Sequence, residues 1–126
     1  MHKTIVYIED DLEMIELVKL ILDKRGYDLI GAIGGRKGID TLLVNKPDLI
    51  LLDLMMPDVD GWEVYQQIKS TERLKNIPVI VITAKAQSID RVLGLEIAKV
   101  DGYITKPFKP QELIDTIEHH LSLNKN

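Results

Sequence analysis

The sequence predicts an α/β fold in which helices cover one parallel sheet. Five short β-rich runs alternate with five segments whose apolar residues recur at helical spacing, which is the pattern of repeated βαβ units. Two of the runs, DLILLD and PVIVIT, are apolar almost throughout, as expected for central strands buried on both faces. The chain has 126 residues and contains no linker, repeat or low-complexity stretch, so we expect a single domain over residues 1–126.

The predicted strands are runs of β-branched and other apolar residues. They cover residues 4–8, 27–33, 48–53, 78–83 and 102–105. Because a helical segment separates each strand from the next, the strands are expected to run parallel. Their carboxyl ends would then lie at the same edge of the sheet.

The first predicted helix follows the first strand. It runs from about Asp11 to Arg25 and has Asp11 as its N-cap. Gly26 ends it, because glycine readily adopts the left-handed conformation that closes a helix. The residues expected on its inner face are Leu12, Ile15, Val18, Lys19 and Leu22.

Four more helices are predicted from the same spacing. A short second helix, with apolar residues at 39, 42 and 43, stops before Pro47 because the residue that precedes a proline disfavours helix. The third runs from about Gly61 to Thr71. Apolar residues at 89, 92, 93 and 97 mark the fourth. The fifth has Pro110 in its first turn and apolar residues at 113, 114, 117 and 121.

The composition argues against several classes of function. Cysteine is absent, which excludes disulfides, thiolate metal sites and a cysteine nucleophile. The formal net charge is −4 and there is no basic block, so direct nucleic-acid binding is not expected. No apolar run approaches the roughly 18 residues of a membrane span, and the first residues do not resemble a signal peptide. We therefore expect a cytoplasmic protein without a membrane association.

Polar side chains follow the strands where ligands bind in open α/β sheets, beyond the carboxyl ends. After the first, third, fourth and fifth strands come, in turn, Glu9-Asp10-Asp11, Asp53, Thr83 and Lys106. If the first and third strands are neighbours, at least three carboxylates converge and would repel one another without a cation. Oxygen ligands favour a hard ion, of which Mg²⁺ is the best candidate. The alternative is that the acidic residues only cap the first helix.

Four motifs contain these residues, and together they resemble a known family. The motifs are IEDD, DLILLDLMMPDVDGWEV, VIVITAKA and DGYITKPF, in this order and each at a strand end. In this combination the sequence resembles the receiver domain of two-component response regulators over essentially its full length. The resemblance implies a flavodoxin-like (βα)5 three-layer sandwich with a five-stranded parallel sheet in the order 2-1-3-4-5.

The resemblance implies roles for four residues around the phosphoacceptor. Asp53 matches the aspartate that accepts a phosphoryl group. Glu9 and Asp10 match the acidic pair that, with Asp53, holds Mg²⁺. Met55 matches the position that offers the metal its backbone carbonyl. No residue is predicted to bind an organic cofactor.

The resemblance also implies roles for residues at the ends of the fourth and fifth strands. Thr83 matches the switch hydroxyl, and Lys106 matches the lysine that pairs with the phosphoryl group. Tyr103 matches the aromatic switch residue, and the Lys106–Pro107 peptide bond is expected to be cis. The fourth helix, the last strand and the fifth helix would form the output surface.

Two departures from the family pattern stand out in the sequence. The stretch IAKVDGY lacks the glycine that usually precedes the last strand, and one residue is added between Thr83 and Lys106. Lys99 or Val100 would adopt a left-handed conformation less easily than glycine. Separately, His119 and His120 are adjacent and are expected to be solvated surface residues.

The resemblance implies a regulatory domain and not an enzyme with an external substrate. It would catalyse only its own phosphorylation and dephosphorylation, with a histidine kinase or phosphotransfer protein as donor and a downstream protein or effector domain as target. Phosphorylation-dependent dimerisation stays open, as does the choice between a single-domain regulator and a receiver excised from a longer regulator or hybrid kinase.

Two other functions fit the sequence less well. An aspartyl-nucleophile, Mg²⁺-dependent phosphatase also ends an apolar strand in Asp, but it needs a second acid where this chain has Met55. A flavodoxin-like electron carrier needs a phosphate loop rich in glycine and hydroxyls after the first strand, where this chain has EDDLE.

Overall fold

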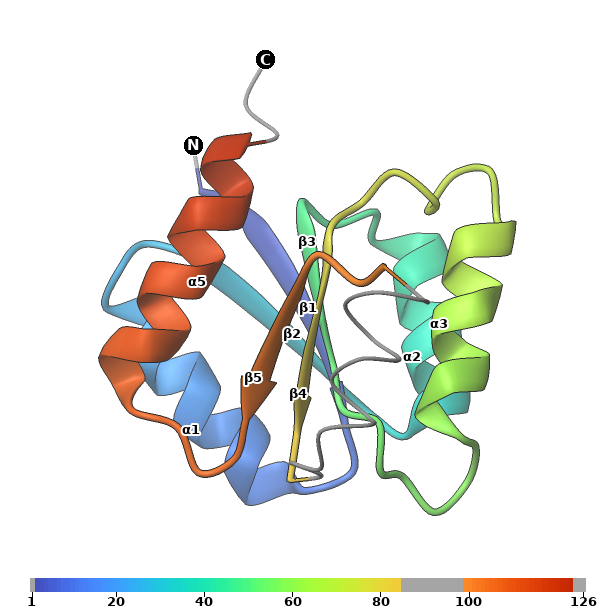
Figure 1. Cartoon of the computed structure of the whole chain (residues 1–126), viewed down its shortest axis with the longest axis horizontal. Helices are drawn as coiled ribbons and strands as arrows, with labels where there is room; N and C mark the ends of the chain where they lie inside the picture. The colour runs from blue at the N-terminus through green and yellow to red at the C-terminus, as the bar shows by residue number, and fades with distance from the viewer. Residues whose placement is uncertain (1, 85–98, 124–126) are drawn as a thin grey trace.

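The computed structural model describes residues 2–84 and 99–123, which form one parallel sheet with helices on both faces (Figure 1). The strands are β1 Thr4–Glu9, β2 Asp28–Ile33, β3 Leu49–Leu52, β4 Val79–Thr83 and β5 Gly102–Thr105. Their order across the sheet is β2-β1-β3-β4-β5, as the family resemblance implied. The described helices are α1 Leu12–Asp23, α2 Gly35–Val44, α3 Gly61–Ser70 and α5 Pro110–Leu123. The helix expected around residues 89–97 lies outside the described residues.

Two hydrophobic cores lie on opposite faces of the sheet. Helices α1 and α5 cover one face and α2 and α3 the other (Figure 1). Side chains alternate between the faces along β1, so Ile5 and Tyr7 join the core under α1 and α5 while Val6 and Ile8 join the core under α2 and α3. Strands β3 and β4 are buried along their whole length, which confirms the prediction that DLILLD and PVIVIT supply the central strands.

Both ends of α1 follow the predicted local chemistry. The Asp11 carboxylate accepts hydrogen bonds from the backbone N–H groups of Glu13 and Met14, as an N-cap should. After the helix, Gly26 takes a φ of +83° and the N–H of Tyr27 reaches back to the carbonyl of Leu22. The acidic run after β1 therefore does include a helix cap, and that cap is Asp11.

The predicted inner face of α1 was partly wrong. The buried residues are Ile15, Val18 and Leu22. Half-buried Met14 and Ile21 lie on one side of this stripe. Because the buried face is shifted toward them, Leu12 and Lys19, on the other side, face solvent. Leu12 is 53% exposed, and the side chain of Lys19 lies within 3.5 Å of the exposed Asp23 carboxylate.

The segment that enters β5 keeps a left-handed residue although the family glycine is missing. Lys99 has a φ of +61°, a conformation that is strained for a residue with a side chain. Two residues later, the Asp101 carboxylate accepts a hydrogen bond from the N–H of Val79 at 2.7 Å, and its own N–H donates to the Val79 carbonyl. These bonds fix the start of β5 beside the start of β4.

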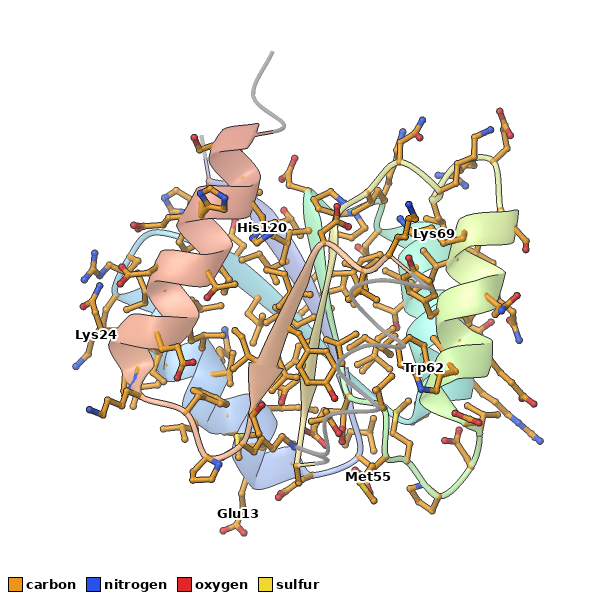
Figure 2. All side chains as sticks on the ribbon, in the orientation of Figure 1. Glu13, Lys24, Met55, Trp62, Lys69 and His120 are labelled. Atoms are coloured by element: carbon orange, nitrogen blue, oxygen red, sulfur yellow. The ribbon has the colours of Figure 1, made fainter. Side chains whose placement is uncertain are left out.

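The prediction that both C-terminal histidines are solvated was wrong for His120. Its ring is half-buried on α5, with Nδ1 2.8 Å from the Thr116 carbonyl and Nε2 2.6 Å from the Asp101 carbonyl (Figure 2). The ring thus links α5 to the segment that leads into β5. His119 is exposed, as expected. Within residues 2–84 and 99–123, no helix is long and apolar enough to cross a membrane.

Candidate functional site

Asp53 directly follows the buried strand β3 and is itself only 3% exposed. Its backbone N–H continues the ladder by donating to the carbonyl of Ile8 on β1. Its Oδ1 accepts a hydrogen bond from the N–H of Met55 at 3.1 Å, which orients the carboxylate in the turn after the strand. Figure 2 places Met55 at the same end of the molecule as the carboxyl ends of β4 and β5. A buried carboxylate at this edge requires compensating partners.

Two more carboxylates from the end of β1 meet Asp53. Glu9, Asp10 and Asp53 each offer one carboxylate oxygen, and the three oxygens lie within 4.8 Å of one another. This follows from the pairing of β1 with β3, whose last paired residues are Ile8 and Leu52. A set of converging carboxylate oxygens that includes buried Glu9 and exposed Asp10 suits a hard divalent cation that keeps some of its water. The residues present therefore fit Mg²⁺.

Lys106 brings a positive charge to the same place from the end of β5. Its Nζ donates to Glu9 Oε1 at 2.6 Å and lies 3.7 Å from Asp53 Oδ2. Its backbone N–H donates to the carbonyl of Thr83, so β4 and β5 both end here. The Lys106–Pro107 peptide bond is cis. The lysine partly offsets the three converging carboxylates but leaves an excess of negative charge.

That excess shows in the titration of the two buried carboxyls. Burial, together with a hydrogen bond to Glu9, raises the pKa of Asp53 to about 7. Burial alone would also raise the pKa of Glu9, but hydrogen bonds from Asp53, Lys106 and Tyr7 lower it to about 2. Without a cation, each of the two carboxylates opposes the ionisation of the other, so the pair keeps a shared proton to higher pH than two separate carboxyls would. A divalent ion would replace this proton.

The remaining predicted residues lie on the neighbouring strands. Thr83 ends β4, is fully buried, and pairs with Thr105 across the sheet. Tyr103 is half-buried on β5 and packs against the core under α2 and α3. Thr83 thus lies at the same sheet edge as Asp53, and Tyr103 lies two residues before the end of β5.

The loop between β3 and α3 is held close to the site by contacts that the sequence reasoning missed. Asp58 accepts hydrogen bonds from the N–H groups of Gly35 and Arg36, so it caps α2, whose own N-cap, Gly34, makes no side-chain cap bond. These main-chain donors lower the pKa of Asp58. Gly61 packs so tightly that a Cβ atom there would lie 2.4 Å from the Cα of Leu54. No local pattern predicts a cap supplied from 23 residues away.

Tyr7 makes a second contact that the sequence analysis did not predict. Its hydroxyl donates to Glu9 Oε1 at 2.7 Å, inside the protein. The spacing in the sequence was a signal for this contact. Residues two apart on a strand share a face, so a tyrosine two positions before an acidic residue can reach its carboxylate. Only the structure shows that it does.

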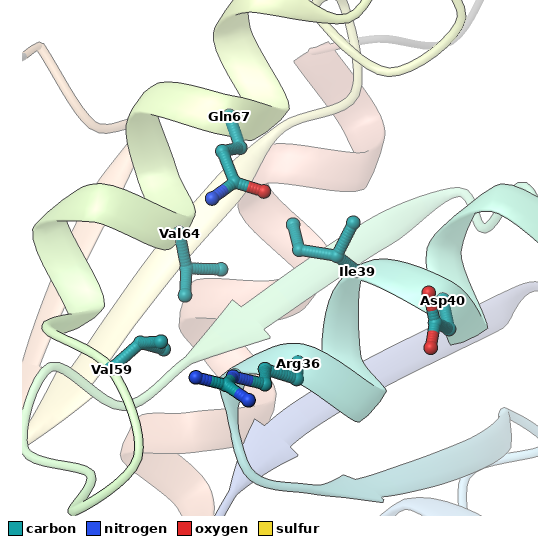
Figure 3. A pocket seen from close by; sticks show the side chains of 7 residues that line it. Arg36, Ile39, Asp40, Val59, Val64 and Gln67 are labelled. Atoms are coloured by element: carbon teal, nitrogen blue, oxygen red, sulfur yellow. The ribbon is translucent and has the colours of Figure 1, made fainter.

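A separate hollow between α2 and α3 does not have the chemistry of the carboxylate cluster. Its volume is about 340 Å³, and Val59, Ile39 and Val64 give it an apolar wall (Figure 3). Arg36, Asp40 and Gln67 complete the lining, together with Gly35. Its lining includes none of Glu9, Asp10, Asp53 and Lys106, so this hollow is separate from the acidic cluster at the sheet edge.

Comparisons with known proteins agree with this geometry. The family model of the response regulator receiver domain matches residues 5–118. The chain is 39% identical over 113 residues to the alkaline phosphatase synthesis transcriptional regulatory protein PhoP of Bacillus subtilis. That match covers 90% of this chain and 46% of the relative, so the chain spans about half the length of that protein.

Solved structures give the same result. The signal receiver domain of a signal transduction histidine kinase from Syntrophus aciditrophicus is 34% identical, with a TM-score of 0.88 over 98% of this chain and 93% of that chain. The BeF3-activated N-terminal receiver domain of Klebsiella pneumoniae RstA is 29% identical, with a TM-score of 0.86 over 94% of this chain and 97% of that chain.

Proposed function

This chain belongs to the response regulator receiver domain family, and we propose that Asp53 is its phosphoacceptor in a Mg²⁺-dependent reaction. The donor would be a phosphohistidine on a histidine kinase or phosphotransfer protein. One observation carries the proposal: the buried Asp53 carboxylate has two further carboxylates within reach of a shared cation and an ammonium group 3.7 Å away. Phosphoryl transfer depends mainly on positioning and on neutralising charge, and this arrangement supplies both.

Each residue has a defined part in the proposed step. An oxygen of ionised Asp53 attacks phosphorus, an O–P bond forms, and the N–P bond to the donor imidazole breaks. Lys106 Nζ, already close to both buried carboxylates, pairs with a phosphoryl oxygen. The Thr83 hydroxyl donates a hydrogen bond to another. Bound Mg²⁺, held by Glu9, Asp10, Asp53 and the Met55 carbonyl, would supply Lewis-acid charge neutralisation.

The output would be a change in the packing around strand β5. When Thr83 moves toward the phosphoryl group, it vacates space that half-buried Tyr103 can enter. The surface formed by the fourth helix, β5 and α5 would then bind a downstream protein or effector domain. In this proposal residues 1–126 act as one receiver domain, and its catalysis is limited to its own phosphorylation and dephosphorylation.

The deciding experiment is phosphorylation by acetyl phosphate. With Mg²⁺, intact mass spectrometry should show one added phosphoryl group on the native protein, and none on Asp53→Asn or in EDTA. Asp40→Asn is the matched control, because Asp40 is an exposed carboxylate on α2. A native-like mass shift in Asp53→Asn would refute the assignment. Sizing columns run on the same samples would reveal whether phosphorylation causes dimerisation.

A further inference from the structure

A buried phenol sits in the middle of a parallel strand and points at the acidic site. Tyr7 is fully buried on β1, in the core under α1 and α5. A buried tyrosine hydroxyl needs a hydrogen-bond partner. This one donates to a carboxylate of the acidic cluster, Glu9 Oε1, at 2.7 Å. The two side chains share a face of the strand because they are two residues apart.

The contacts of Glu9 assign different tasks to its two oxygens. Oε1 accepts from both the Tyr7 hydroxyl and Lys106 Nζ, at 2.7 and 2.6 Å. Two donors use the two lone pairs of a carboxylate oxygen. Oε2 accepts from the N–H of Asp10 at 3.1 Å and so has acceptor capacity left. Glu9 is also one of the three residues whose carboxylate oxygens converge.

We propose that Tyr7 is a positioning residue for the divalent-cation site: its hydroxyl holds Glu9 Oε1 and so fixes the orientation in which the Glu9 carboxylate can share a cation with the other two carboxylates. This inference rests on the proposed function, in which the cluster binds Mg²⁺. Without the hydroxyl, Glu9 can rotate to pair with Lys106 through both oxygens, which removes a ligand from the cation. Groups that orient metal ligands typically change metal affinity by about 10- to 100-fold.

The surroundings of Tyr7 suit this task, and its ring suits a conservative substitution. Burial, followed by the charge of Glu9, raises its pKa far above the ordinary value for a phenol. These surroundings favour the neutral hydroxyl, which is the form that donates to Glu9. The ring also fills the core, so Tyr7→Phe removes one oxygen atom and leaves the packing in place.

The test compares Mg²⁺ binding by Tyr7→Phe and by the native full chain. Calorimetry gives the Kd, and the fluorescence of Trp62, the single tryptophan, gives a second measurement. We expect the Kd of Tyr7→Phe to rise about 10-fold. Tyr27→Phe is the control: it is half-buried just before β2, at the amino end of the sheet, and should bind like the native chain.

A double-mutant cycle separates positioning from general stability. Glu9→Asp shortens the side chain so that it no longer reaches the phenol, and in that background Tyr7→Phe should change the Kd less than about 2-fold. If Tyr7→Phe lowers the Tm equally with and without Mg²⁺ and leaves the Kd unchanged, its role is structural and the inference fails. If the native chain accepts a phosphoryl group while Tyr7→Phe binds Mg²⁺ normally, only this inference fails. A native chain that binds no Mg²⁺ overturns this inference and the proposed function together.

Discussion

Raising the pH in the absence of metal ions should destabilise the protein through Asp53. In the folded state burial and the adjoining Glu9 raise the pKa of Asp53 to about 7, whereas its ordinary value is 3.8. Between these two values the folded protein keeps a proton that the unfolded chain has released. The stabilisation that comes from this proton is therefore complete below pH 3.8 and is lost as the pH rises through about 7.

The magnitude follows from the linkage between proton binding and folding. Each pH unit over which one extra proton is bound changes the free energy of unfolding by about 1.4 kcal/mol. From about pH 5 to about pH 8 the loss from Asp53 is about 2 to 3 kcal/mol, since the proton is fully released only above its folded-state pKa. Glu9 acts in a different window: its pKa falls from 4.5 to about 2, so its stabilising contribution changes only in acid and is constant over this range.

Urea unfolding in EDTA at several pH values measures this effect. The quantity to plot is the difference in unfolding free energy between the native chain and Asp53→Asn, because the subtraction removes titrating groups that the two share. That difference should fall by about 2 to 3 kcal/mol over the range, and Mg²⁺ should restore most of it. Asp40→Asn should leave the native profile unchanged. A difference that stays flat within about 0.5 kcal/mol would refute the shared-proton reasoning.

Three further outcomes are expected. Lys106→Met should slow phosphorylation by acetyl phosphate by about 10²-fold, because it removes the lysine ammonium group beside the acceptor oxygen. A rate within a factor of about two of the native rate would contradict this. Gly61→Ala should lower the unfolding free energy by about 2 kcal/mol, since its Cβ would collide with the backbone at Leu54; urea titration measures it. Lys99→Gly should raise stability by up to about 1 kcal/mol by relieving the left-handed strain, while Lys99→Val lowers it; thermal melts of the pair would decide.

The elements of the fold were predictable from the sequence because their signals are local. The strands and helices α1 and α3 lie within two residues of the predicted ranges, and α2 and α5 contain the apolar positions predicted for them. Apolar runs, caps and prolines give these signals because they act on the residues next to them. The strand order was different: it came only from the family resemblance. Pairing of β1 with β3 joins segments that are about 40 residues apart, and no periodicity encodes which strands are neighbours.

The side-chain contacts within the site were less predictable for the same physical reason. One feature of the site was predictable: residues that follow parallel strands lie at the same edge of the sheet. This placed Glu9, Asp10, Asp53 and Lys106 together. The Tyr7 hydroxyl bond depends on a rotamer and on strand geometry. The Asp58 cap on α2 and the His120 bridge to the Asp101 carbonyl join separate elements, which only the packed fold brings together.

Charge balance connects these contacts to the proposed chemistry. Three converging carboxylates face one lysine, and a hydroxyl and two backbone N–H groups supply only partial compensation. The formal excess of negative charge that remains, together with burial, raises the pKa of Asp53. A protonated carboxyl is a poor nucleophile, so in the proposed reaction a divalent ion that stabilises ionised Asp53 would also favour its attack on phosphorus. In the proposed reaction, cation binding and activation of the Asp53 oxygen would therefore be coupled.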